Sequence, residues 1–114
     1  MVLLRVELEN NDEKIKFETH GILNKNKNTL IYDDNKTKTC IDFNNNILKR
    51  YDSDSCITFD FNNEVMSVDL IAQKASFTLE FKRIKLNKTD KLFEVEYIVE
   101  NTNKIYYKVE IINL

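Results

Sequence analysis

The stretch LFEVEYIVENTNKIYYKVEI, residues 92–111, alternates apolar and polar side chains twice, on either side of a polar Asn-Thr-Asn break. A period of two places successive side chains on opposite faces of a β-strand. The apolar face comprises Phe93, Val95, Tyr97, Val99, Ile105, Tyr107, Val109 and Ile111. The opposite face carries charged residues such as Glu94, Glu96 and Lys108. The stretch therefore predicts two antiparallel strands joined by a short turn, each buried on one face only.

The same alternation recurs along the chain between clusters of Asn and Asp, for example in residues 2–8 and 57–61. Proline is absent and glycine occurs once, so we expect Asn and Asp, which tolerate left-handed backbone, to make the turns. Short strands in meander order favour closure, since closure removes exposed sheet edges. We find no convincing sequence repeat. We expect an all-β chain with a single domain over residues 1–114, an antiparallel meander β-barrel of about eight to ten strands.

Two segments of the chain are ambiguous. Residues 64–75 fit a helix capped by Asn63, because Met66 and Leu70 are four apart, but they also fit a strand with Met66, Val68 and Leu70 on one face. We prefer the strand. In residues 75–86 the apolar phase slips by one residue, which predicts a β-bulge that bends a long strand around a barrel corner.

Several segments resemble the YwiB-like family of small bacterial proteins, which has a calycin-like β-barrel and no assigned activity. The resemblance covers most of the chain from about residue 14 onward and implies a calycin or lipocalin type of barrel. The segment IAQKAS stands where the family usually has a Tyr-x-Thr-Pro-Tyr-Gly-like stretch. The segments that carry the resemblance are KIKFETHGIL, NTLIYDD, KTKTCIDFNNNILKRYDS, ASFTLEFKRIKL, LFEVEYIVEN and KIYYKVEI.

Composition argues against several classes of protein. The net charge of −2 and a pI near 5.5 are unlike those of a dedicated nucleic-acid binder, which is normally basic. No apolar run approaches the roughly 20 residues of a membrane span, and the first residues lack a signal-peptide core. We therefore expect a cytoplasmic protein that does not engage a membrane. In that compartment Cys40 and Cys56 would remain thiols.

Catalytic motifs are absent from the sequence. One histidine and one glycine leave no room for a nucleophile elbow, a phosphate-binding loop or a dinucleotide fingerprint. A zinc site would need His20, Cys40 and Cys56 to converge, although none of them has a ligand at short spacing. The strand phase places His20 on the outer face and Gly21 inside, where a bulge or the close approach of another backbone is expected. We expect no enzyme, no metal and no cofactor.

Two surface features are candidates for binding a partner. The basic cluster comprises Lys82, Arg83, Lys85, Lys88 and Lys91. It lies on a strand face without aromatic stacking residues, so it gives no strong nucleic-acid signal. The last strand has apolar outward residues that are candidates for a homodimer contact, namely Tyr106, Ile112 and Leu114.

The barrel interior is the most informative place for function. Tyr32, Tyr97 and Tyr107 are expected to point inward, and their hydroxyls need partners. In residues 47–51, either Ile47, Lys49 and Tyr51 or Leu48 and Arg50 face inward, and both registers place a cation near the interior. The candidate ligand-binding residues are Tyr32, Arg50, Tyr51, Tyr97 and Tyr107.

These groups suit a small apolar or amphipathic acidic ligand, such as a fatty acid, held in the barrel. Alternatively, the same groups satisfy one another in an interior filled by its own side chains. The protein would then be an interaction module whose outer face or rim contacts another protein, in a setting that includes RNA-related processes.

Overall fold

The computed structural model describes residues 1–100 and 103–113, and within them every regular element is a β-strand. The first five strands are β1 (Val2–Asn10), β2 (Glu13–Asn24), β3 (Thr29–Asp34), β4 (Thr37–Asp42) and β5 (Ile47–Tyr51). The remaining strands are β6 (Ser55–Asp60), β7 (Val65–Leu70), β8 (Ala75–Lys88), β9 (Leu92–Val99) and β10 (Lys104–Asn113).

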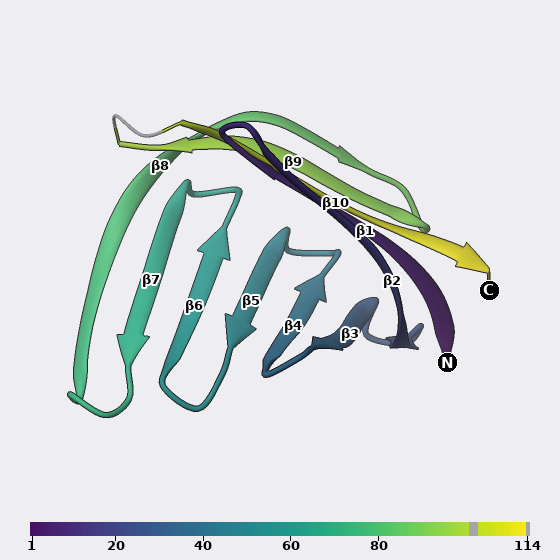
Figure 1. Ribbon diagram of the computed structural model, residues 1–114, viewed down its shortest axis with the longest axis horizontal. Coiled ribbons are helices and arrows are strands. Elements are labelled where there is room, and N and C mark those ends of the chain that lie inside the picture. The colour runs from purple at the N-terminus through teal and green to yellow at the C-terminus, as the bar shows by residue number, and fades with distance from the viewer. Residues whose placement is uncertain (101–102, 114) are drawn as a thin grey trace.

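Each strand pairs antiparallel with its neighbours in sequence, and β10 pairs back onto β1 to close the barrel. Leu3 lies opposite Asn113, so both ends of the chain lie at the same end of the barrel (Figure 1). The short strands β3 to β7 form one side, and β9, β10 and β1 cross over the other side (Figure 1). The expected all-β antiparallel meander barrel is confirmed, at the upper end of the expected strand number.

Two long strands turn the corners between these sides. Residues 13–21 of β2 pair with β1 and residues 21–24 pair with β3, so Gly21 pairs with both neighbours. Similarly, β8 pairs with β7 through residues 75–80 and with β9 through residues 81–88. The register between β8 and β9 shifts between Arg83 and Lys85, which confirms the predicted bulge. The bulged residue, Ile84, is consequently exposed.

The ambiguous segment 64–75 contains strand β7, so the preferred interpretation is correct and the helix alternative is wrong. Met66 and Val68 lie opposite Leu79 and Phe77 of β8. Residues 71–74 form a turn that ends at Lys74, with a φ of 51°. This turn was not expected, because it contains none of the Asn, Asp, Gly or Pro residues that usually mark one.

Three consecutive hairpins, β3–β4, β5–β6 and β7–β8, share one construction. Each begins after a residue with left-handed backbone, and these residues, Asn28, Asn46 and Glu64, are equally spaced along the chain. The carbonyl of each accepts a hydrogen bond from the N–H of a phenylalanine, which stands one residue past the last residue that pairs in that hairpin's second strand. The phenylalanine partners are Phe43, Phe61 and Phe81, in the same order.

The turns after the first two of these hairpins also use the same side-chain cap. Asp42 Oδ1 accepts the backbone N–H groups of the second and third residues that follow it, at 3.1 and 3.3 Å. Asp60 Oδ1 does the same, at 3.1 Å for each bond. The chain therefore contains a structural repeat in its turns. This repeat lies in turn geometry and a few spaced residues, whereas the intervening side chains differ.

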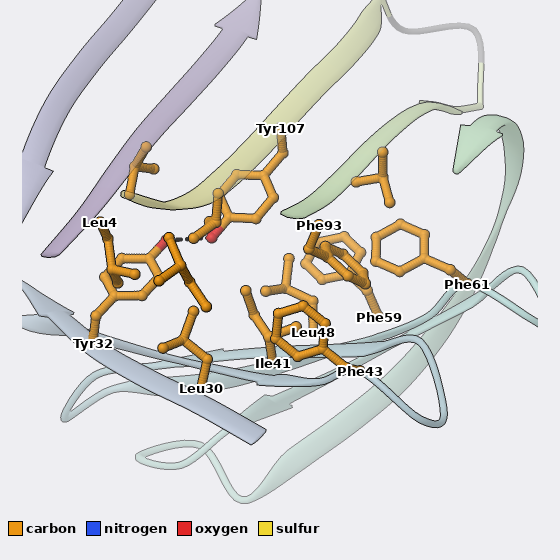
Figure 2. Close-up of a cluster of buried hydrophobic side chains, with 14 of the residues drawn as sticks. Leu4, Leu30, Tyr32, Ile41, Phe43, Leu48, Phe59, Phe61, Phe93 and Tyr107 are labelled. Carbon is orange, nitrogen blue, oxygen red and sulfur yellow. Dashed lines mark hydrogen bonds between the residues drawn. The ribbon is translucent and has the colours of Figure 1, made fainter. Parts of the chain in front are cut away.

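The three repeated phenylalanines fill one end of the barrel, which we call the closed end. Phe61 is fully buried and its ring centroid lies 5.4 Å from that of Phe81, 5.6 Å from Tyr97 and 6.0 Å from Phe93. Most of these pairs adopt tilted or edge-to-face geometry, which aromatic rings prefer over a direct face-to-face stack. Figure 2 shows Phe43, Phe59, Phe61 and Phe93 gathered at this end.

The outer face of β2 carries His20, as the strand phase predicts, and His20 is exposed. Its neighbour Gly21 is buried, and a Cβ atom there would lie 2.7 Å from Leu4 Cδ1 and 2.9 Å from the carbonyl oxygen of Ile31. Of the two roles considered for Gly21, the close approach of another backbone is correct. The His-Gly pair is therefore part of the barrel wall.

Candidate functional site

The end of the barrel opposite the phenylalanines, the open end, is incompletely filled. At the closed end, Phe43 and Phe61 directly follow β4 and β6, whereas the open ends of the same two strands begin with Thr37 and Ser55. The smaller side chains leave a cavity of about 230 Å³. Its apolar wall is formed by Leu8, Leu48, Ile57 and Phe59.

The register of β5 decides which cation faces this cavity. Arg50 lies opposite Thr39 on one side and Ile57 on the other, whereas the exposed Lys49 lies opposite Cys40. Directly opposed residues share a face of the sheet, so Leu48 and Arg50 point inward. The alternative register, with Ile47, Lys49 and Tyr51 inside, is wrong.

The structure brings most of the predicted ligand-binding residues together. Arg50, Tyr97 and Tyr107 line the cavity from three strands, and Tyr51 lies at its rim. Tyr32 does not line it, but its hydroxyl is hydrogen-bonded to that of Tyr107 (Figure 2). Their role in binding a ligand stays a prediction.

Asp52 is the cavity residue that sequence reasoning missed. Asp52 belongs to one of the Asp-rich clusters that predict turns, and it caps that turn: Oδ1 accepts the backbone N–H groups of Asp54 at 2.8 Å and Ser55 at 2.9 Å. These bonds lower the pKa of the Asp52 carboxyl, so it is ionised at neutral pH. The signal that would have found it is its position two residues after Arg50, directly beyond the end of β5, which continues the phase of that strand.

Arg50 has no partner of opposite charge. Among residues 1–100 and 103–113, no carboxylate lies within ion-pair distance of its guanidinium, and its Nε is buried without a hydrogen-bond acceptor. Its positive charge instead acts on the hydroxyls of Tyr32, Tyr97 and Tyr107. A buried N–H group without an acceptor, such as this Nε, is costly because it has lost water without gaining an equivalent contact.

The tyrosines remain hydrogen-bond donors over the whole physiological pH range. Burial raises the pKa of Tyr97 to about 12, against a small lowering by the charge of Arg50. Burial also raises the pKa of Tyr32 and, more strongly, that of Tyr107. Each of these groups therefore keeps its proton at neutral pH.

The cavity consequently contains more donors than acceptors. The bond between Tyr32 and Tyr107 consumes one of their two protons, and the structure gives the Tyr97 hydroxyl no hydrogen bond within the described chain. The fully buried Thr39 hydroxyl lies near Tyr32 and lowers its pKa, but its position does not meet hydrogen-bond geometry. Such a surplus of donors around a cation suits a carboxylate, whose oxygens only accept.

The other candidate sites do not assemble. Cys40 on β4 and Cys56 on β6 are free thiols with β5 between them, and His20 is on the outer face of β2. Burial raises the pKa of the Cys40 thiol, which disfavours the thiolate that a metal would bind. Within the ranges that the structure describes, no three His, Cys, Asp or Glu side chains are grouped as a metal would require.

The basic cluster on β8 is largely engaged within the barrel. Arg83 Nη1 donates to the carbonyl of Phe61 at 3.2 Å, and Lys88 Nζ donates to that of Phe43 at 2.6 Å. Lys85 pairs with Glu94 at 3.4 Å. These side chains therefore brace the closed end.

Of the candidate dimer residues, Ile112 is exposed, whereas the Tyr106 hydroxyl donates a hydrogen bond to Glu94. Leu114 lies outside the described residues.

Comparisons of the chain with protein families, curated proteins and solved structures found no match. In the described part of the chain, no helix has the length and apolar character needed to cross a membrane.

Proposed function

We propose that this barrel binds a small amphipathic acid in its open-end cavity, with the carboxylate on Arg50 and the apolar part against Leu48, Ile57 and Phe59. The observation that carries the proposal is the Arg50 guanidinium, which lines a cavity and lacks an acceptor for its buried Nε. A ligand carboxylate would supply that acceptor, and Tyr97 would supply a further donor to it.

The size of the cavity limits the ligand. Pockets for drug-sized molecules measure roughly 300–1,000 Å³, so a volume of about 230 Å³ suits a short acid better than a long-chain fatty acid. The mixture of an apolar wall with a few converging polar groups is typical of small-molecule sites. The cavity also favours this function over the interaction module, because that module was expected to have a packed barrel.

The wider interpretation belongs to the same proposal: a non-enzymatic, cytoplasmic, calycin-like binding barrel of the YwiB-like type. The two free thiols, Cys40 and Cys56, are compatible with a reducing compartment. The described residues that line the cavity include no histidine or cysteine, which supports binding without catalysis.

The proposal is tested first by native mass spectrometry of freshly purified protein, to detect a small molecule that co-purifies with it. Titration with 4-methylpentanoate, followed by amide chemical shifts, then gives an affinity. We expect the variant Arg50→Met to bind this acid about tenfold or more weakly, because a hydrogen bond to a charged group contributes about 1.5–3 kcal/mol.

Lys49→Met is the matched control, because Lys49 is the next residue on the same strand and is exposed on the outer face. It removes the same charge without altering the cavity, so its affinity should equal that of the wild type. The proposal would be overturned if native mass spectrometry found only the bare protein and if millimolar 4-methylpentanoate changed no amide chemical shifts. Equal weakening by both variants would also overturn it, since it would show that only the net charge matters.

A further inference from the structure

The charged residues that line the cavity have opposite signs and do not neutralise each other. Arg50 and Asp52 are two residues apart, on the strand end of β5 and at the start of the following turn, and both border the cavity. Successive residues of the same face are separated by roughly 6.6 Å along a strand. No ion pair joins the two side chains within residues 1–100 and 103–113.

The two charges lie at different depths. Arg50 is half-buried with its Nε shielded from water, beside the hydroxyls of Tyr97 and Tyr107. Asp52 is exposed at the rim, together with neutral side chains such as Thr37 and Tyr51. Both backbone bonds to Asp52 use Oδ1, and the Ser55 hydroxyl also interacts with this carboxylate, whose Oδ2 retains lone pairs to accept a further bond. A ligand entering the cavity therefore meets an anion at the rim and a cation farther in.

We propose that the ligand is a zwitterion, an α-amino acid with an aliphatic side chain. Its carboxylate binds Arg50, its ammonium group binds Asp52 Oδ2 at the rim, and its side chain packs against the apolar wall formed by Leu8, Leu48, Ile57 and Phe59. The inference rests on the proposed function, since it assigns the same cavity and the same anchor for the carboxylate.

Electrostatics distinguishes this ligand from a simple acid. Asp52 repels an anion that carries no compensating charge, whereas it attracts the ammonium group of a zwitterion. An amino acid carries an ammonium and a carboxylate group on the same carbon, so it can pair with Asp52 and Arg50 at once. The backbone of β5 and the following turn holds these two side chains apart and in place. The aliphatic class follows from the wall, because its side chains offer no polar partner to a polar ligand side chain.

Three probes of nearly the same shape isolate each charge: leucine, 4-methylpentanoate, which lacks the ammonium group, and 3-methylbutylamine, which lacks the carboxylate. Each is titrated into the full-length protein while amide chemical shifts are recorded. We expect leucine to bind about tenfold more tightly than 4-methylpentanoate and the amine to bind most weakly. The variant Asp52→Asn should weaken leucine to the level of the acid and leave the acid unchanged or slightly stronger.

The Asp52→Asn variant keeps an oxygen that can accept the two backbone bonds of the turn, so the fold is retained. Asp60→Asn is the matched control, because Asp60 caps the equivalent turn at the closed end. Its affinity for leucine should equal that of the wild type.

The outcomes separate the two proposals. Binding of 4-methylpentanoate as tightly as leucine, with no effect of Asp52→Asn, would overturn the zwitterion and leave the acid-binding function in place. Binding of none of the three probes, or of the amine alone, would overturn both. Equal weakening of leucine by Asp52→Asn and Asp60→Asn would overturn the role of Asp52, because it would trace the effect to turn stability.

Discussion

Replacing Gly21 with alanine should destabilise the barrel, although glycine is usually a poor residue in a strand. A Cβ at this position would lie 2.7 Å from Leu4 Cδ1 and 2.9 Å from the carbonyl oxygen of Ile31. Leu4 is fully buried and the carbonyl belongs to the backbone of β3, so neither can move away cheaply. Overpacking of this kind costs about 1–3 kcal/mol. The lower entropy of the unfolded alanine chain offsets about 0.4–1 kcal/mol of that.

The net expectation is a loss of about 1–2 kcal/mol, which corresponds to a melting temperature lower by about 4–8 °C for a domain of this size. The corner pairing of β2 with β3 involves only residues 21–24, so its amide hydrogens should also exchange faster. Thermal and urea unfolding measure the loss, with His20→Ala on the outer face as the control, expected within about 0.5 kcal/mol of wild type. A Gly21→Ala variant as stable as that control would refute the reasoning from close contact.

Two further predictions concern the interior. Phe61→Ala removes the centre of the aromatic cluster and should cost about 3–5 kcal/mol in urea unfolding, whereas a loss below 1 kcal/mol would mean that the closed end is loosely packed. The raised pKa of Tyr97, about 12 against an ordinary 10.0, means that the folded state holds this proton more tightly. Its contribution to stability is therefore complete below pH 10 and is lost as the pH rises toward 12. Tyr97→Phe should make stability decline less over that interval, and an unchanged pH profile would contradict the assignment.

The strands were predictable because burial of one face imposes a period of two that any segment displays by itself. Phe93, Val95 and Tyr97 are buried on β9 as their alternation predicts, and the same holds for Tyr107 on β10. Meander order followed from short turns, and the Asn residues at several of them do adopt positive φ, as Asn11 and Asn35 illustrate.

The register of β5 was not predictable, since both of its faces carry an apolar residue and a cation. It is decided by non-local pairing, which places Arg50 between Thr39 and Ile57. The alternation of apolar and polar residues also fails to predict burial at the corners of the barrel, where its two sides separate. Ile15 and Phe77 are in the inward phase of β2 and β8, yet they are 50% and 46% exposed because no strand covers them.

The cavity could not be predicted from the sequence, because it results from side chains of different strands that meet at one end of the barrel. Successive turns of a meander lie at opposite ends of the barrel. Thr37 and Ser55 therefore lie at the open end and Phe43 and Phe61 at the closed end, a difference that appears only once the strands are arranged in space. Sequence reasoning found the tyrosines and a cation, since large polar side chains in the inward phase are conspicuous. It missed Asp52, because Asp is common in turns for structural reasons and its presence there does not suggest a binding site.

The repeated hairpin contributes stabilising contacts at one end of the barrel and cavity-lining residues at the other. Its carbonyl–amide bonds and phenylalanines stabilise the closed end, and the strands β4 and β6 begin at the other end with the small polar residues Thr37 and Ser55. Substitutions at the open end therefore leave the stabilising half untouched, since almost none of its packing passes through them. The shape and charge of the cavity can therefore be changed through the open-end turns, one turn at a time, while the phenylalanine cluster of the closed end keeps its packing.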